Sequence, residues 1–278
     1  MMATGDLIAL LAERGIAGIN LGAIILWPET ILMPQDAPQE VIDQLTKDGV
    51  LRAGINMANG LLVTGKAANG DPQGVSPDLA RAIAERLSAG VSYVPFASPG
   101  ELADAAAAGL WDIGLIAAEP SRAETIAFTA AYVEIEATYL VPAGSPIQSV
   151  DEVDREGVRI GVYGRSAYGL WLSSNIERAE LVKTDGVDAS FDAFVEHGLE
   201  AMAGLRPRLV KDVEQLPGAR ILDGQFTAVQ QAIGTKPDRE VAAAFLRDFV
   251  EEAKSSGLVA SLIEKHGGTG RLTVAPLA

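Results

Sequence analysis

Residues 109–132, GLWDIGLIAAEPSRAETIAFTAAY, decide the fold of this chain. Within them, residues 112–117 (DIGLIA) form a short apolar run that is typical of a buried strand. The alanine-rich residues 101–108 precede it and predict a helix, for which Gly109 supplies the C-cap. Arg122 follows the strand closely. Because ligands bind outside the carboxyl ends of strands in open α/β sheets, this position makes Arg122 a candidate site residue.

Strands and helices alternate on both sides of this stretch, in two series of similar size. The first series has predicted strands at 50–56, 91–96 and 112–117, with helices at 77–87 and 101–108. The second has strands at 158–163, 180–184, 200–205, 219–222 and 226–233, with helices at 166–174, 189–197 and 208–215. This alternation predicts parallel sheets flanked by helices, and the repetition predicts two similar lobes joined by residues 137–143. Helices at 238–254 and 258–265, packed back on the first lobe, would create two chain crossings and hence a hinge.

Composition excludes several classes of protein. The chain has 278 residues, a formal net charge of −15 and no cysteine. Nucleic-acid binders depend on clustered Lys and Arg, so the acidity argues against that class. The lack of thiols excludes disulfides, zinc–thiolate sites and cysteine nucleophiles. No run reaches the roughly 20 apolar residues of a membrane span.

The N-terminal stretch, residues 1–47, is not placed in the fold by its pattern. Residues 16–27 (IAGINLGAIILW) have the length of a signal-peptide core, but Asp6 and Glu13 stand where a basic region is expected. Pro28, Pro34 and Pro38 then interrupt the chain. One interpretation is an additional helix and strand or a poorly ordered extension, which the pattern favours. The other is a cleavable export signal.

Several short motifs in a fixed order resemble one protein family. They are residues 74–80 (GVSPDLA), 109–114 (GLWDIG), 121–122 (SR), 127–132 (AFTAAY) and 157–166 (GVRIGVYGRS). Together they resemble the periplasmic solute-binding proteins of ABC importers, in the amino-acid-binding family 3 branch, over about residues 48–268. The resemblance implies a type II periplasmic-binding-protein fold with a double-crossover hinge. Its lobes would be residues 48–138 plus 231–278, and residues 139–230.

The resemblance also implies a function. A protein of this family captures a small carboxylate-bearing ligand, an amino acid or related organic acid, between two closing lobes. It would be a periplasmic monomer that delivers the ligand to an ABC permease, with no catalytic activity, cofactor, metal, nucleic acid or membrane span of its own. A ligand sensor that reports to another partner is an alternative which the sequence leaves open.

Two positions carry the expected carboxylate site. The resemblance implies that Arg122 grips the ligand carboxylate, for which a guanidinium fork suits two parallel hydrogen bonds. The alternative is an ion pair of Arg122 with Glu119 or Glu124. In the turn that contains Gly164 and Arg165, Ser166 begins a predicted helix, where free amides favour an anion. Ser166 is then a ligand contact, a plain N-cap or both, and Arg165 is a further anion contact or a solvated side chain.

The chain departs from the family pattern where a ligand ammonium group would bind. The expected acidic residue at the end of strand 200–205 is Leu205, followed by Arg206. The serine or threonine expected five residues before Arg122 is Ala117, and the expected aromatic residue of the first loop is Asn59, in the segment that begins at Asn56.

These departures leave several interpretations open. Glu119 could receive the ammonium group, or the ligand could have none. Arg206 at the site would suit a dicarboxylate, whereas its alternative role, which the pattern slightly favours, is a structural pair to Asp212 or to a neighbouring loop.

Enzymatic alternatives have few residues to support them. The histidines are His197 and His266, and neither stands in a metal or triad pattern. Residues 164–169 lack the Gly-Lys-Ser/Thr ending of a P-loop. The concrete alternative is a cyclohexadienyl dehydratase, because some relatives of the family carry that activity. There Glu119, with its pKa raised by burial, would act as general acid.

Overall fold

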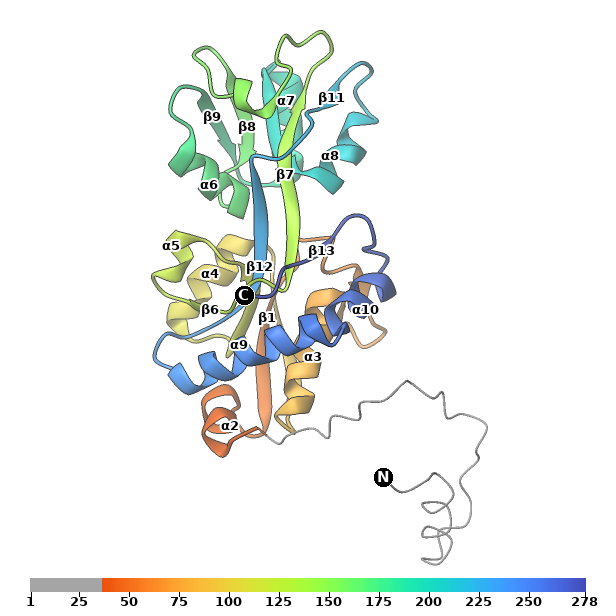
Figure 1. The fold of residues 1–278 in the computed structure, drawn as a ribbon. Coiled ribbons are helices and arrows are strands. Elements are labelled where there is room, and N and C mark those ends of the chain that lie inside the picture. Colours follow the sequence, from red (N-terminus) through yellow and green to blue (C-terminus); the bar gives the residue numbers. More distant parts are fainter. Residues whose placement is uncertain (1–36) are drawn as a thin grey trace, which may run out of the picture. The chain divides into compact units, whose positions relative to one another are not determined.

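The computed structural model describes residues 37–278 (Figure 1). The apolar run 16–27, with Pro28 and Pro34, lies outside the described residues. Strands in the described part of the chain are β1 (Val50–Asn56), β2 (Gly65–Lys66), β3 (Pro72–Gln73), β4 (Gly90–Phe96), β5 (Ile113–Ala117), β6 (Ala127–Phe128), β7 (Val133–Val141), β8 (Arg159–Tyr163), β9 (Glu180–Thr184), β10 (Ala201–Leu205), β11 (Arg220–Ile221), β12 (Thr227–Thr235) and β13 (Thr273–Val274). Helices are α2 (Gln39–Leu45), α3 (Val75–Arg86), α4 (Pro99–Ala108), α5 (Pro120–Ala123), α6 (Ala167–Asn175), α7 (Val187–Glu196), α8 (Arg206–Val213), α9 (Glu240–Ser255) and α10 (Leu258–Lys265), with a 3-10 turn η2 (Val150–Glu152).

The helix ends show why the sequence could locate these elements. Gly109 follows α4 in the left-handed conformation, with φ of 64°, and thereby confirms the predicted C-cap. At the other end of α4, the Ser98 side chain accepts a hydrogen bond from the Glu101 amide at 3.1 Å. Pro99 therefore occupies the first helical position, and the helix begins two residues before the predicted start at residue 101.

The strands form one large mixed sheet, whereas the prediction was a separate, mostly parallel sheet in each of two lobes. The main order is β4-β1-β5-β12-β7-β10-β8-β9. The predicted parallel pairing is found for β1 with β4 and β5, and for β8 with β9 and β10. The predicted connector, residues 137–143, instead lies largely within strand β7, which pairs antiparallel with both β10 and β12. Because β12 also pairs antiparallel with β5, the two parallel sets merge into one sheet.

Figure 1 shows β7 and β12 running side by side between two groups of elements. The hydrophobic core follows the same division. One cluster is built around β1, α3, α9 and α10, and includes Leu51, Leu79 and Phe249. Another is built around β8, α6 and β10, and includes Ile160 and Leu172. The side chain of Leu205 packs against both clusters.

Helix α2 belongs to the first of these clusters, through Val41 and Leu45. The amide of Ala242 in α9 donates a hydrogen bond to Gln44 Oε1 at 2.9 Å, which fixes α2 on α9. Part of the stretch that the sequence pattern left unplaced is therefore packed in the fold. Among the helices of residues 37–278, none has the length and apolarity that a bilayer crossing requires.

Candidate ligand-binding site

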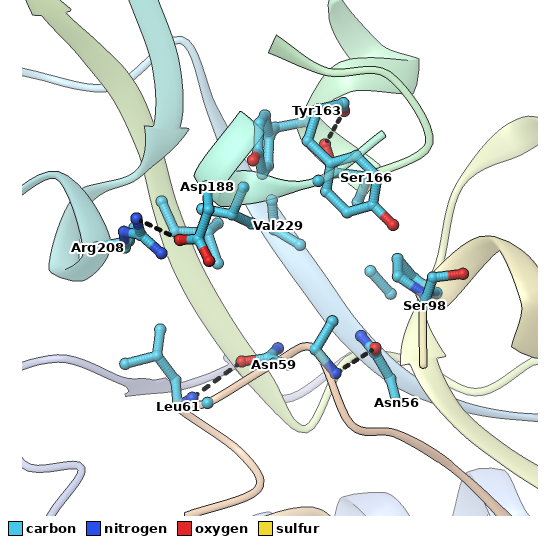
Figure 2. Close-up of a pocket in the computed structure, with 18 of the residues that line it drawn as sticks. Asn56, Asn59, Leu61, Ser98, Tyr163, Ser166, Asp188, Arg208 and Val229 are labelled. Carbon is cyan, nitrogen blue, oxygen red and sulfur yellow. Dashed lines mark hydrogen bonds and ion pairs between the residues drawn. The ribbon is translucent and has the colours of Figure 1, made fainter. Parts of the chain in front are cut away.

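A cavity of about 630 Å³ opens at the carboxyl ends of β1, β5, β8 and β9. One side is formed by residues 56–61 and by the first turn of α4, and the facing side by residues 166–168 and 185–189. Strand β12 contributes Val229 and Gln231. Figure 2 shows Asn59 on one side of the cavity and Asp188 on the other. Both series of strands and helices therefore contribute to one cavity at the strand ends, where α/β sheets hold ligands.

Arg122 lies in the wall of this cavity, on the short helix α5 that follows β5. It is only 5% exposed. Its Nη1 donates to the carbonyl of Ala117 at 2.8 Å and its Nη2 donates to the carbonyl of Arg165 at 3.1 Å. The described residues contain no ion pair of Arg122 with Glu119 or Glu124. Burial lowers the pKa of Arg122 to about 10, an effect that the charge of Glu119 opposes. The guanidinium is thus a buried cation at a cavity, hydrogen-bonded to neutral acceptors.

Ser166 is the N-cap of α6, as predicted. Its Oγ accepts a hydrogen bond from the Gly169 amide at 3.0 Å and donates to the carbonyl of Tyr163 at 2.7 Å. Ser166, Ala167 and Tyr168 all line the cavity. The amides of the first helical turn have no acceptor within the helix. This turn can therefore offer N–H groups to an anion in the cavity, while the Ser166 hydroxyl holds the turn in shape.

Asn56, Asn59 and Ala117 also line the cavity. Asn56 Oδ1 accepts from the Ala58 amide and Asn59 Oδ1 accepts from the Leu61 amide, both at 3.2 Å (Figure 2). The oxygen ends of both side chains thus hold the loop after β1, which leaves their NH₂ groups as the donors for a ligand. Ala117 contributes no side-chain polar atom, and its carbonyl holds Arg122.

Four predicted site residues do not line this cavity: Gly164, Arg165, Glu119 and Arg206. Arg206 Nε pairs with Glu136 Oε2 at 2.5 Å, and Arg206 Nη2 donates to the carbonyls of Leu222 and Gly224. Asp212 is bound by another arginine of α8. The Arg206 side chain is directed toward β7 and the loop before β12, in keeping with the alternative of a pair with a neighbouring loop.

Gly164 and Arg165 form the turn between β8 and α6. The Gly164 amide donates to the carbonyl of Thr184 at 3.0 Å, and Arg165 Nη2 lies 2.8 Å from Asp104. Glu119 is the residue that precedes α5. Burial raises its pKa to about 7, and the charge of Arg122 lowers it in part. A perturbed carboxyl group is thus present, but it lies outside the residues that line the cavity.

The sequence did not reveal an ionic group on the opposite side of the cavity. Arg208 Nη2 lies 2.8 Å from Asp188 Oδ1 (Figure 2). Arg208 Nε lies 2.8 Å from Asp212 Oδ1. The Asp212 side chain is 1% exposed, whereas that of Asp188 is 87% exposed. Asp185, Asp188, Arg208 and Lys211 all line the cavity. The sequence could have indicated these four residues, because they follow the strands that end at Thr184 and Leu205. The carboxyl ends of these strands lie at the same edge of the sheet as that of β5.

Gln231 is a further residue that the sequence did not single out. It lies on β12, opposite Ala117 of β5, and lines the cavity although it is only 5% exposed. Its amide can both donate and accept hydrogen bonds. Within the described part of the chain, no group of three or more His, Asp or Glu residues is placed to hold a metal ion.

Comparison with known proteins agrees with this architecture. The family model described as bacterial extracellular solute-binding proteins, family 3, matches residues 62–269. This chain belongs to that family. The match covers most of the chain and includes every residue named above as lining the cavity except those at positions 56–61.

Solved structures share the fold at low sequence identity. A mutant of ArgBP from T. maritima is 20% identical, with a TM-score of 0.65, over 82% of this chain and 99% of that one. An ancestral amino acid-binding protein, described as a precursor of cyclohexadienyl dehydratase, is 21% identical, with a TM-score of 0.65, over 81% and 98%. An amino acid ABC transporter substrate-binding protein from Streptococcus pneumoniae, bound to L-arginine, is 19% identical, with a TM-score of 0.65, over 81% and 97%. No curated protein sequence matches the chain.

Proposed function

We propose that this protein captures a free amino acid in the 630 Å³ cavity as the binding component of an ABC importer. The observation that carries the proposal is Arg122, a buried guanidinium in the cavity wall whose recorded hydrogen-bond partners are the neutral carbonyls of Ala117 and Arg165. A desolvated cation favours an anion beside it, and a carboxylate matches the guanidinium fork. The first turn of α6 would complete the carboxylate site with its free amides.

The opposite side of the cavity suits the amine of the ligand. Leu205, which stands where the family resemblance places an acidic residue, lines the cavity and offers no charge. Asp185 and Asp188, at the start of α7, line it as well. Asp188 pairs with Arg208 through Oδ1, so that Oδ2 is available to an ammonium group. We therefore propose that Asp188 takes the place of the missing acid at position 205.

Binding energy requires both sides of the cavity to act together. A hydrogen bond that involves a charged group contributes about 1.5–3 kcal/mol net, whereas micromolar affinity needs about 8 kcal/mol. Arg122 alone is insufficient. In our proposal, β7 and β12 flex, and the elements around β8, α6 and α7 close on those around β1, α4 and α5. This closure excludes water from the cavity and strengthens the polar contacts inside it. The proposed lobes are residues 48–138 plus 231–278 and residues 139–230.

The test is a thermal-shift screen of the purified protein. The panel contains the amino acids, beginning with arginine, lysine and cysteine, together with their deaminated analogues and a set of dicarboxylates. A ligand at 100 times its Kd adds about 2.7 kcal/mol to the free energy of unfolding, which gives a clear rise in Tm. We expect amino acids alone to raise the Tm. If dicarboxylates shift the Tm and amino acids do not, the proposed amine contact is wrong.

One observation favours a second function, that of a cyclohexadienyl dehydratase. Glu119 has a pKa raised to about 7 by burial, as a general acid at neutral pH requires. Against this function, Glu119 does not line the cavity in which a substrate would bind. Incubation with prephenate, followed by the absorbance of phenylpyruvate, tests it directly. Turnover that disappears in Glu119→Gln would replace the binding proposal with the enzymatic one.

A further inference from the structure

Arg165 reaches from the turn between β8 and α6 to helix α4, whose first turn contributes to the facing side of the cavity. Its Nη2 lies 2.8 Å from both Oδ1 and Oδ2 of Asp104. This ion pair joins the two groups of elements whose movement our proposed function requires. Arg165 and Asp104 also line a second cavity, of about 410 Å³, whose wall includes Arg122.

Helix α4 is shaped to accept this guanidinium. A Cβ atom added at Gly100 would lie 2.5 Å from Cζ and 2.6 Å from Nε of Arg165. Real Cβ atoms do not approach other heavy atoms so closely, so a side chain at position 100 would require the end of the Arg165 side chain to shift from its place over the first turn of α4. Asp104 stands one turn further along the same helix, which brings its carboxylate to the end of the Arg165 side chain.

The main chain of Arg165 holds the ligand-site arginine at the same time. Its carbonyl accepts the hydrogen bond from Arg122 Nη2 at 3.1 Å. A displacement of the Arg165 turn from α4 would therefore remove one of the two acceptors that fix the Arg122 guanidinium. One residue thus couples the approach of the two sides to the orientation of the expected carboxylate receptor.

We propose that Arg165 is a positioning residue: its ion pair with Asp104 over Gly100 clamps the β8–α6 turn onto α4 and thereby orients Arg122 for the ligand. The inference rests on the proposed function for its effect on affinity, but the clamp itself exists without ligand. By populating the closed arrangement in the free protein, the clamp reduces the fraction of binding energy that closure consumes.

The solvent exposure of Arg165 and Asp104 sets the size and the salt dependence of the clamp's effect on ligand affinity. The side chains of Arg165 and Asp104 are 56% and 66% exposed, so water and salt screen their attraction. Exposed ion pairs contribute little, and the clamp should change ligand affinity by about two- to five-fold. The effect should be largest at low ionic strength and should vanish in high salt.

The first experiment needs no ligand. Because the chain has no cysteine, a pair of introduced cysteines at exposed positions, Glu85→Cys on α3 and Glu177→Cys beyond α6, can carry spin labels for distance measurement. We expect Asp104→Asn and Arg165→Gln to widen the distance distribution at low salt. We expect the exchanged pair, Asp104→Arg with Arg165→Asp, to restore it. Glu152→Gln breaks a comparable exposed ion pair on one side only, with Arg155, and is the matched control.

Gly100→Ala supplies an independent variant that leaves every charge in place. Its methyl group should displace the Arg165 guanidinium and widen the distribution as Asp104→Asn does. An unchanged distribution in Asp104→Asn, Arg165→Gln and Gly100→Ala overturns the clamp. If the distributions widen but no amino acid binds in any variant, the clamp stands and the proposed function fails. If amino acids bind and the clamp variants retain the wild-type Kd, its role in positioning Arg122 is wrong.

Discussion

Asp112 Oδ2 accepts hydrogen bonds from both the main-chain amide and Nε of Arg52, at 3.0 and 2.9 Å, and its Oδ1 accepts from Nη2 at 2.8 Å. The same three bonds recur between Glu200 and Arg159, at 2.8, 2.9 and 2.9 Å. In each case an arginine at the start of one strand fixes a carboxylate just before or at the start of its parallel neighbour. The two series of strands and helices therefore repeat a side-chain arrangement as well as a strand order.

The two repeated pairs differ in burial, and this predicts different effects on stability. The Asp112 side chain is 3% exposed and is also bonded by Arg239, whereas that of Glu200 is 36% exposed. We expect Asp112→Asn to lower the free energy of unfolding by about 2–3 kcal/mol, because it removes the charge from a buried acceptor that binds two partly buried arginines. Glu200→Gln is the matched control and should cost several-fold less. Chemical denaturation measures both; equal losses would contradict the role of burial.

Acid sensitivity should follow Asp112 as well. Burial alone would raise its pKa, but hydrogen bonds from Arg52 and Arg239 outweigh burial and hold the pKa below its usual range. The contribution of Asp112 to stability is therefore complete above about pH 4, the ordinary value, and is lost as the pH falls below it. Asp112→Asn should consequently show a smaller loss of Tm between pH 5 and pH 3 than the wild-type protein.

Glu119 predicts the opposite pH dependence. Its pKa in the folded protein is raised to about 7, above the ordinary value of 4.5. The folded state therefore favours the protonated carboxyl, and the group destabilises the fold as the pH rises from about 5 to 8. We expect Glu119→Gln to raise the Tm at pH 8 relative to wild type and to have little effect at pH 5. A difference of the same size at both pH values would show that the carboxyl group titrates normally.

Substitution of Arg122 should reduce the affinity for the ligand. Arg122→Gln loses the charge-assisted hydrogen bonds to the ligand carboxylate and should raise the Kd for an amino acid by about 10- to 100-fold. Arg122→Lys keeps the charge but loses the planar fork, and it should recover only part of the affinity. Arg206→Ala, at a residue that points away from the cavity, is the control and should bind as wild type does. Calorimetric titration would make the proposed carboxylate site untenable if Arg122→Gln retained full affinity.

Substitution of Asp188 should weaken the binding of an amino acid but not that of its deaminated analogue. We expect Asp188→Asn to weaken binding of an amino acid by about ten-fold, the value of one charge-assisted contact, and to leave any binding of the deaminated analogue unchanged. Asp192→Asn alters the same helix four residues further on, at an exposed residue that does not line the cavity. It should leave both affinities unchanged. An equal loss for both ligands in Asp188→Asn would assign Asp188 to helix stability alone.

Leu205 offers the converse test. Leu205→Asp introduces a carboxylate in the cavity wall at the position where the family resemblance places an acid. If the amine of the ligand binds near this wall, the substitution should preserve or tighten amino-acid binding, particularly in combination with Asp188→Asn. Titration of the single and double variants measures the coupling. Strict additivity of the two changes would place the amine elsewhere in the cavity.

The predicted elements agree closely with the structure, whereas the sheet was predicted only in part. The strands β1 and β9 have their predicted bounds. The antiparallel strand β7, which starts at Val133, was missed in its first half. Residues 133–137 (VEIEA) alternate apolar and acidic residues, with Glu134 and Glu136 on the less buried face, so a local strand pattern was present there and was overlooked.

The site shows the same limit. The place of Arg122 after a strand and of Ser166 at a helix start, together with the family resemblance, marked both as candidates, whereas Arg208 was not considered and Arg206 was offered either as a site residue or as a structural pair. The two lie on one helix two residues apart, about 200° around its axis, so that only one can face the cavity. Which one does so depends on how α8 packs against β7 and β10, and no local pattern records it.

The sequence by itself determined the order of strands and helices, their caps and the strand ends at which polar residues gather, since these depend on neighbours within a few residues. The tertiary structure alone decided that β7 and β12 join both series into one sheet, that Arg208 with Asp188 faces the cavity, and that Arg165 lies over Gly100. Each of these depends on the packing of segments that lie 20 or more residues apart, as Arg208 and Asp188 do, where the contacts are set by burial and shape rather than by local periodicity.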